Sequence, residues 1–178
     1  MDDQLQDIEQ QVGRNYDSPP LHLWSPELSG DIDIRIDADG RWFHEGSPIE
    51  RAAIVRVFAS ILRREEDGCY YLVTPGEKWR IQVDLLPLVV TDVDRYTDAE
   101  HGDSLRCTLN TGRTQLVNAE FGLFLESRMD NVAALHLPHG LAALFTRSAW
   151  YRLVAMAVEK EGVTCIESAG ETFPLEAG

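Results

Sequence analysis

The chain has 178 residues, of which 44% are hydrophobic, so it is long enough for one large domain or for two smaller ones. Its formal net charge of -14 and its pI of about 4.6 argue against DNA, RNA and anionic membranes as partners, because all of them carry the same sign of charge. An anionic ligand would need a local group of arginines or a helix N-terminus.

The cellular compartment is predicted from the first residues and from the cysteines. The beginning, MDDQLQDIEQQ, is acidic and polar, unlike a secretory signal peptide. No stretch approaches the ~20 apolar residues of a membrane-spanning helix. The three cysteines, Cys69, Cys107 and Cys165, are widely spaced, which favours reduced thiols over a disulfide framework. We therefore expect a cytoplasmic protein.

The first elements in chain order are a short helix, a strand and a hairpin turn. Leu5, Ile8 and Val12 share one side of a possible helix that GRNYDSPP at 13–20 ends, so residues 1–21 are predicted to be an arm or a short helix. A poorly ordered terminus explains the same pattern equally well. DIDIRID at 31–37 alternates as a half-buried strand does, and Asp39-Gly40 is typical of a hairpin turn.

A helix is predicted to follow this hairpin. Ser47 suits the N-cap, Pro48 the first helical position, and Glu50 the third residue after the cap, which together form a capping box. Gly68 is the expected C-terminal stop. The buried stripe is predicted to consist of Ile54, Val57, Phe58, Ile61 and Leu62.

The remaining elements are mostly strands. Hairpins are predicted at 69–84, around Pro75-Gly76-Glu77, and at 104–120, around NTGR, with another strand at 86–93. A second helix runs from its cap at Thr146 to Glu161. A strand at 163–168 and a loose tail at 171–178 complete the prediction.

The two predicted helices resemble each other. When Arg51 is placed over Arg147, the apolar residues of both helices coincide, and each helix is followed by a glycine and then by a cysteine-bearing strand. We infer an internal duplication, although amphipathic helices also align by chance. The predicted fold is α+β, with two tandem repeats at 22–90 and 91–170, each an antiparallel sheet packed by one helix.

Arg51 and Arg147 both lie on the flank of an apolar stripe, three residues before its first large side chain. One interpretation is structural: the stems cover apolar surface while the charged heads reach water or a carboxylate. The other is that both heads hold an anion between the two repeats, with help from helix N-termini.

Other motifs carry weaker indications of chemistry. His136 and His139 lack further ligands at metal-binding spacing, and the aspartates at 31–39 do not match a calcium loop, so no metal is expected. No glycine-rich phosphate loop or nucleophile motif is present, so we assign no catalytic residue and no cofactor. His44 and Glu45 could act as an acid–base pair, but neighbouring residues on a strand point to opposite faces.

Two segments resemble a bacterial family known as domain of unknown function 1285. They are DGRWFHEGSPIERAAIVRVFASILRREEDGCYYLVTPGEKWRIQVD at 39–84 and GLAALFTRSAWYRLVAMA at 140–157. The stretch after IQVD departs from the family's acidic-Ala-Pro pattern. The resemblance implies a duplicated core, a C-terminal half superficially like pleckstrin-homology folds, a ligand site at the domain interface for a nucleotide-based molecule, and a signalling role.

The leading functional hypothesis is therefore non-enzymatic binding of a small anion, such as a nucleotide derivative, between the two repeats. A second hypothesis is a protein-interaction module that binds a basic partner. A third is an enzyme that uses His44 and Glu45. The candidate ligand-binding residues are Arg51, Arg147, His44, Thr74, Lys78 and Trp79.

Overall fold

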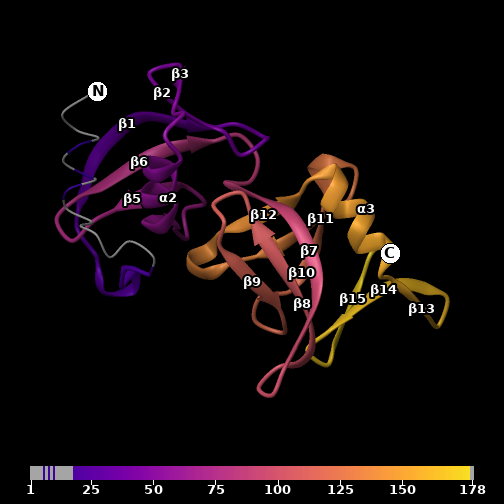
Figure 1. Ribbon diagram of the computed structural model, residues 1–178. Coiled ribbons are helices and arrows are strands. Elements are labelled where there is room, and N and C mark those ends of the chain that lie inside the picture. The colour runs from indigo at the N-terminus through magenta and orange to yellow at the C-terminus, as the bar shows by residue number, and fades with distance from the viewer. Residues whose placement is uncertain (1–5, 7, 9, 11–17, 177–178) are drawn as a thin grey trace. The chain divides into compact units, whose positions relative to one another are not determined.

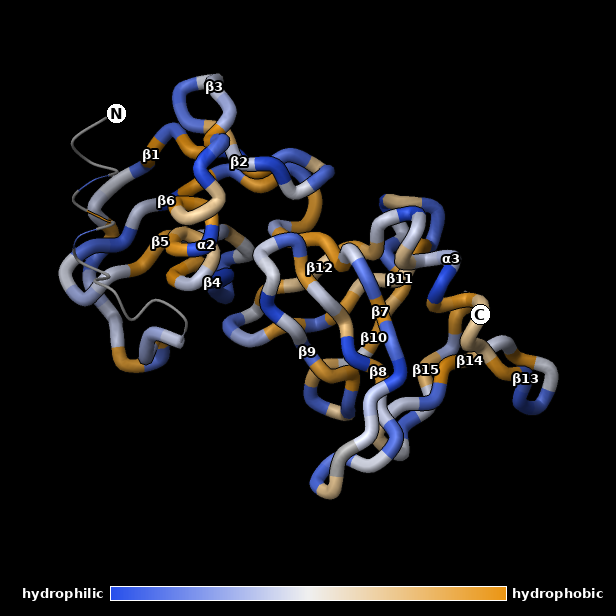
Figure 2. Tube along the Cα trace, in the orientation of Figure 1, coloured by the Kyte–Doolittle hydropathy of each residue, from blue (hydrophilic) through white to orange (hydrophobic). Residues whose placement is uncertain are grey.

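The computed structural model describes residues 6, 8, 10 and 18–176. The chain forms two compact units (Figure 1). The N-terminal unit comprises Met1–Pro87 with His139–Leu141, and the C-terminal unit comprises Leu88–Pro138 with Ala142–Gly178. Hydrophobic residues concentrate on the strands of each unit, whereas the connecting loops are largely hydrophilic (Figure 2).

The N-terminal unit is built on a six-stranded sheet in the order β3-β2-β1-β6-β5-β4. Its central strands, β1 and β6, are parallel, and all other neighbours are antiparallel. The sheet is therefore mixed rather than purely antiparallel as predicted. Its strands are β1 (Leu28–Ile36), β2 (Trp42–His44), β3 (Ser47–Pro48), β4 (Leu62–Arg64), β5 (Tyr70–Val73) and β6 (Lys78–Val83).

One face of this sheet is covered by helix α2 (Ala52–Ser60). The alternation of DIDIRID buries Ile32, Ile34 and Ile36 while the residues between them stay exposed, as predicted. Helix α2 buries Ile54, Val57 and Phe58, and the Phe58 ring lies 6.1 Å from that of Trp42 on β2. These residues form the core of the unit, because they remove contiguous apolar surface from water.

Helix α2 is shorter than predicted at both ends. Ser47 and Pro48 form β3 and pair with β2, so Ser47 is not the N-cap and the predicted capping box is wrong. Leu62 lies in β4, which pairs with β5, rather than in the helical stripe. The physical reason is that ladder hydrogen bonds to neighbouring strands outweigh local helix-start preferences.

The C-terminal unit contains a second six-stranded sheet, in the order β10-β11-β12-β7-β8-β9, in which β12 and β7 are parallel. Helix α3 (Arg147–Ala155) follows β12 and is capped by Thr146, whose hydroxyl accepts from the Ala149 amide, as predicted. The strands are β7 (Leu88–Asp98), β8 (Gly102–Leu109), β9 (Thr114–Val117), β10 (Leu123–Glu126), β11 (Val132–His136) and β12 (Ala142–Phe145).

The two sheets have the same topology. When the strands of each sheet are numbered in chain order, both sheets read 3-2-1-6-5-4, with the parallel pair between the first and sixth strands. This confirms the predicted duplication. The helices do not correspond, however, because α2 joins the third and fourth strands whereas α3 follows the sixth. The alignment of Arg51 with Arg147 is therefore not the structural repeat; it reflects the shared helical period.

A small third sheet belongs to the C-terminal unit. It has the order β13-β14-β15, with β13 (Val158–Lys160), β14 (Val163–Ser168) and β15 (Glu171–Pro174). Two predictions are corrected here. The second helix ends at Ala155, because Val158–Lys160 pair with β14. Residues 171–174 are not a loose tail, because they pair with β14, and Leu175 after them is buried.

The N-terminal arm is only partly described. Ile8 is buried, whereas Leu5 and Val12, its predicted partners on the helix, lie outside the described residues. Leu21–Leu23 form a short 3-10 helix, η1. Among the described helices, none is long and apolar enough to span a membrane.

Gly140 provides a test of the packing in the N-terminal unit. Its φ is +71°, and an added Cβ would lie 3.0 Å from the Arg64 carbonyl oxygen. We expect Gly140→Ala to lower the free energy of unfolding by about 2–3 kcal/mol, because backbone strain and a steric clash combine. Gly112 also has a positive φ, of +84°, but the space around it is open. Gly112→Ala is therefore expected to cost only the backbone strain, about 1 kcal/mol. Equal losses in urea unfolding of the two variants would contradict the predicted clash.

Candidate functional site

A pocket of about 280 Å³ lies at the start of α2 in the N-terminal unit. It brings together two of the six predicted ligand-binding residues, His44 and Arg51. The lining residues are His44, Ser47, Pro48, Ile49, Glu50, Arg51 and Ile54.

The pocket is built by a tight hairpin. Glu45 and Gly46 have φ values of 49° and 76°, which is typical of the two central residues of the turn that matches strand twist. The turn pairs His44 with Ser47 and Phe43 with Pro48. The Ile49 amide then donates to the Trp42 carbonyl at 2.8 Å. This pairing sets the direction in which the chain reaches Arg51.

Hydrogen-bond donors are available at this end of α2. Arg51 is the N-cap residue, with an extended backbone and no side-chain cap. Within the described part of the chain, no acceptor is found for the amides of Ala52 and Ala53. The first amides of a helix carry a partial positive charge, and an anion satisfies them.

The two charged side chains that line the pocket, Arg51 and Glu50, have opposite effects on the binding of an anion. Arg51 and Glu50 are both exposed, and neither forms an ion pair or hydrogen bond with another described side chain. Arg51 favours an anion in the pocket, and Glu50 disfavours it. The net attraction for an anion therefore depends on a contact with the guanidinium that is closer than the one with the carboxylate. Glu45 does not line the pocket, so it gives the acid–base hypothesis for His44 no support.

Thr74, Lys78 and Trp79 lie elsewhere in the same unit, on the β5–β6 hairpin. Thr74 is buried, and its hydroxyl accepts from the Glu77 amide at 3.1 Å, so it stabilises the turn. Trp79 is half-buried; its indole donates to Glu77 at 3.4 Å, and an added Cβ on Gly30 would lie 3.3 Å from its ring. Both residues are accounted for by local structure.

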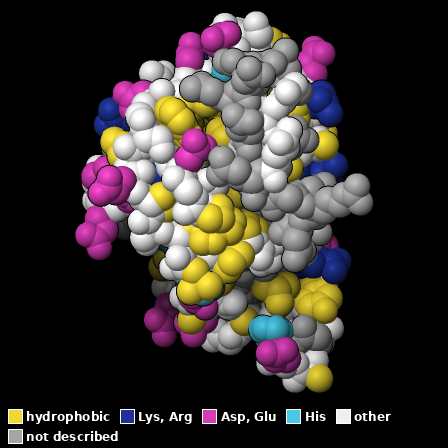
Figure 3. Space-filling view, turned by 90° about the vertical axis from the view of Figure 1, so that its left-hand side faces the viewer, with side chains coloured by type: hydrophobic (Ala, Val, Ile, Leu, Met, Phe, Trp, Pro, Cys, Tyr) yellow, Lys and Arg dark blue, Asp and Glu magenta, His cyan; other side chains and the backbone are white. Residues whose placement is uncertain are grey.

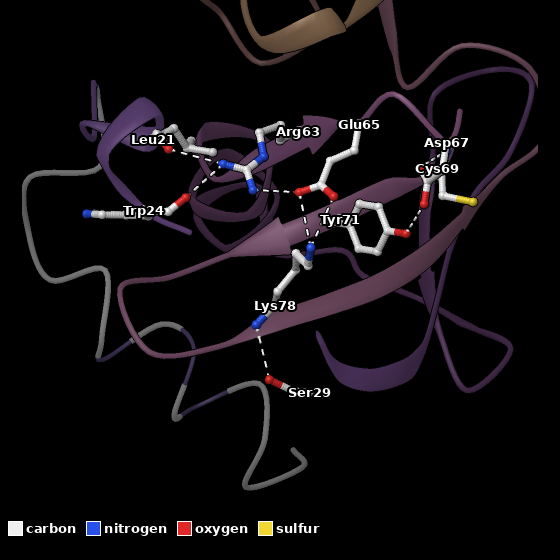
Figure 4. A network of polar contacts seen from close by, with 9 residues as sticks. All are labelled: Leu21, Trp24, Ser29, Arg63, Glu65, Asp67, Cys69, Tyr71 and Lys78. Atoms are coloured by element: carbon white, nitrogen blue, oxygen red, sulfur yellow. Dashed lines mark hydrogen bonds and ion pairs between the residues drawn. The ribbon is translucent and has the colours of Figure 1, made fainter. Parts of the chain in front are cut away.

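Lys78 takes part in a partly buried polar network (Figure 4). Its ammonium group lies 3.1 Å from Glu65 and 5.0 Å from the centre of the Tyr71 ring. Arg63 also pairs with Glu65, at 2.6 Å, and donates to the carbonyls of Leu21 and Trp24. The network therefore ties the segment at η1 to β4 and β6.

The network shifts the pKa values of its acidic groups. Burial raises the pKa of Glu65, but hydrogen bonds from Arg63 and Lys78 outweigh it, so the net pKa lies below the usual value. The hydrogen bond from Tyr71 to Asp67, 2.6 Å long, lowers the pKa of Asp67 and raises that of Tyr71. These groups keep their ordinary charges at neutral pH, which is typical of a structural network.

The register of β1 separates the two groups of predicted residues. His44 pairs with Ile34, whereas Lys78 pairs with Leu28. Six residues of strand correspond to about 20 Å. One small ligand in the pocket therefore does not contact both His44 and Lys78.

Arg147 is the first residue of α3 in the C-terminal unit. Its guanidinium donates to the Tyr151 hydroxyl, with Nη2 at 3.2 Å, and lies 5.5 Å from the centre of the Tyr151 ring. This contact between residues four apart is expected on an exposed helix face.

His136 and Cys107, which lie outside the pocket, have structural surroundings. His136 stacks on Phe124, with ring centroids 4.4 Å apart. Burial raises the pKa of the Cys107 thiol to about 12, so it stays protonated at neutral pH. No group of three metal-ligating side chains occurs among residues 6, 8, 10 and 18–176.

Sequence reasoning missed most of the pocket lining, namely Ser47, Pro48, Ile49 and Glu50. Their capping pattern predicts the start of a helix instead. The dipeptide Glu45-Gly46 between WFH and SP was the available signal for a hairpin, since a glycine in a two-residue turn favours that geometry.

Comparison with known proteins gives matches to one family. Residues 19–85 match the model of the N-terminal domain of a domain of unknown function, DUF1285, and residues 87–175 match its C-terminal domain. A solved DUF1285 family protein from Silicibacter pomeroyi DSS-3 is 38% identical, with a TM-score of 0.80, over 88% of this chain and 86% of that one. Another, from Shewanella baltica OS155, is 29% identical, with a TM-score of 0.55, over 68% and 90%. No curated protein matches.

Proposed function

The chain belongs to the DUF1285 family, and from this premise we propose that its N-terminal unit binds a small anion in the pocket at the start of α2. The observation that supports the proposal is that His44 and Arg51 line one pocket at the start of α2. In this proposal the anion accepts hydrogen bonds from the Arg51 guanidinium, near the end of α2 where the helix dipole is positive.

The size of the pocket restricts the ligand. Sites for drug-sized molecules occupy roughly 300–1,000 Å³, and this pocket, at about 280 Å³, lies just below that range. It suits a phosphate or carboxylate group better than a whole nucleotide. A nucleotide derivative would place one phosphate in the pocket and its base outside. We propose a sensing or signalling role in the cytoplasm, in keeping with the three free cysteines.

The surface charge is consistent with a local rather than a general anion site. On the face shown in Figure 3, lysines and arginines form separate small groups rather than one continuous basic patch. Such a surface does not attract polyanions over long distances. Affinity for an anion must therefore come from direct contacts in the pocket.

We expect Arg51→Ala to weaken the binding of inorganic phosphate or AMP by about tenfold, because a hydrogen bond to a charged group contributes about 1.5–3 kcal/mol. Isothermal titration calorimetry of the full chain measures this. The matched control is Arg56→Ala, which removes the same charge from an exposed position on the same helix but does not line the pocket. Equal effects of the two substitutions would mean that only overall charge matters.

Glu50→Gln provides a test of opposite sign. Removing this carboxylate from the pocket rim should strengthen phosphate binding severalfold, since it removes a like charge near the anion. If neither phosphate nor AMP binds the wild-type chain or Glu50→Gln, the proposed function is wrong.

A further inference from the structure

The third sheet of the C-terminal unit has one face that packs on the unit and one that does not. On the packed face, the Ser168 hydroxyl accepts from the Leu105 amide at 2.8 Å and donates to the Val117 carbonyl at 2.6 Å. Ile166 is fully buried on the same face, and the Phe173 ring lies against Gly122. These contacts fix the sheet in place, so its other face is a stable surface.

The opposite face carries an open groove of about 610 Å³. Strand register places Cys165 opposite both Val158 and Pro174, with Val163 at the turn end of β14. Cys165 is buried at the floor, whereas Val158 and Val163 keep 39% and 41% of their surface exposed. The lining residues are Lys160, Glu161, Val163, Cys165, Thr172 and Pro174. Exposed apolar side chains around an apolar floor, with a polar rim, are typical of an interaction surface.

The sheet that carries this groove is acidic, whereas the groove itself is lined by one acidic side chain, Glu161, and one basic side chain, Lys160. Residues 158–176 contain five glutamates, at 159, 161, 167, 171 and 176, against the single Lys160. Lys160 already pairs with Glu167. The remaining carboxylates would repel nucleic acids and acidic proteins and would attract basic ones. The carboxylates therefore favour a positively charged partner, and the groove favours an apolar side chain in that partner.

The edge of the sheet is also open. β13 pairs with β14 on one side, and no described strand pairs with its other side. β13 is only three residues long, so backbone pairing alone would bind a partner weakly. The side chains that enter the groove must supply most of the specificity.

We propose that this face of the third sheet docks a basic segment of another protein, in which an apolar side chain flanked by lysines or arginines fills the groove over Cys165. The surface lies in the C-terminal unit and shares no residue with the anion pocket at α2. The inference is thus independent of the proposed anion site.

Fluorescence anisotropy with the full chain tests the proposal. The probe is a labelled peptide, Lys-Leu-Lys-Leu-Lys, compared with Lys-Ser-Lys-Ser-Lys of the same charge. We expect the leucine peptide to bind at least about fivefold more tightly, since it buries apolar surface in the groove. Equal binding of both peptides would show only general attraction to an acidic protein and would overturn the proposal, as would no binding.

Two matched substitutions locate the site. Val163→Ser is expected to weaken the binding of the leucine peptide by about threefold. Val154→Ser should have no effect, although Val154, on α3, is exposed to a similar extent, 40% against 41%. Similarly, Glu161→Gln should weaken the binding of both peptides more than Glu120→Gln does, because Glu161 lines the groove. Equal responses within either pair would overturn the assignment of the groove as the docking site.

Discussion

Replacement of Phe58 by alanine is expected to lower the free energy of unfolding of the N-terminal unit by about 3–5 kcal/mol, through lost apolar burial and a residual cavity. Phe58 is fully buried, and its ring lies 6.1 Å from that of Trp42. A loss of this size is a large fraction of the stability of a single domain. Urea unfolding followed by tryptophan fluorescence measures it, with Trp42 as a neighbouring reporter.

The matched control is Phe58→Leu, which keeps most of the apolar volume and should cost less than about 1.5 kcal/mol. If alanine and leucine were equally well tolerated, the Phe58 side chain would not be packed between the backbone of α2 and Trp42 on β2. The experiment would then contradict the packing of the helix on the sheet.

The second large effect is expected for Ser168→Ala, which removes one hydroxyl and leaves two buried backbone groups without partners. The Leu105 amide and the Val117 carbonyl belong to residues that are themselves fully buried. An unsatisfied buried polar group costs about 1–3 kcal/mol, so we expect a total loss of about 2–4 kcal/mol. The physical cause is desolvation without compensation rather than a lost contact of the side chain itself.

Hydrogen exchange and urea unfolding together test this expectation. Amides of β14 should exchange faster in Ser168→Ala, because this strand is held on the unit partly through that hydroxyl. Ser148→Ala, at an exposed position on α3, is the control and should change stability by no more than about 0.5 kcal/mol. Unchanged β14 exchange in Ser168→Ala would mean that the third sheet is held by its apolar contacts alone.

The local elements of this protein were predictable from the sequence. The strand at 31–36, the hairpins joined near Gly76 and Gly112, and the cap at Thr146 all follow from alternation, turn residues and capping preference, which act over a few positions. The duplication was predicted as well, although from a helix alignment that is not the structural repeat. The repeat lies in the strand order, which depends on pairing between residues far apart in the chain.

The candidate site depended more on tertiary structure. The sequence pointed to Arg51 and His44, but it placed them in one group with Lys78 and Trp79. The register along β1 separates these pairs, and no local pattern specifies that register. Glu65, the partner of Lys78, came from a segment expected to end a helix.

The sequence by itself determined where apolar and polar residues alternate, where the chain turns, and where its charged residues lie. The tertiary structure alone decided that Ser47-Pro48 is a strand rather than a helix cap, because its ladder partners lie on β2. It also decided which carboxylates neutralise which cations. Only the assembled sheets bring these partners within hydrogen-bond distance, so only they distinguish a paired side chain from one that faces a ligand.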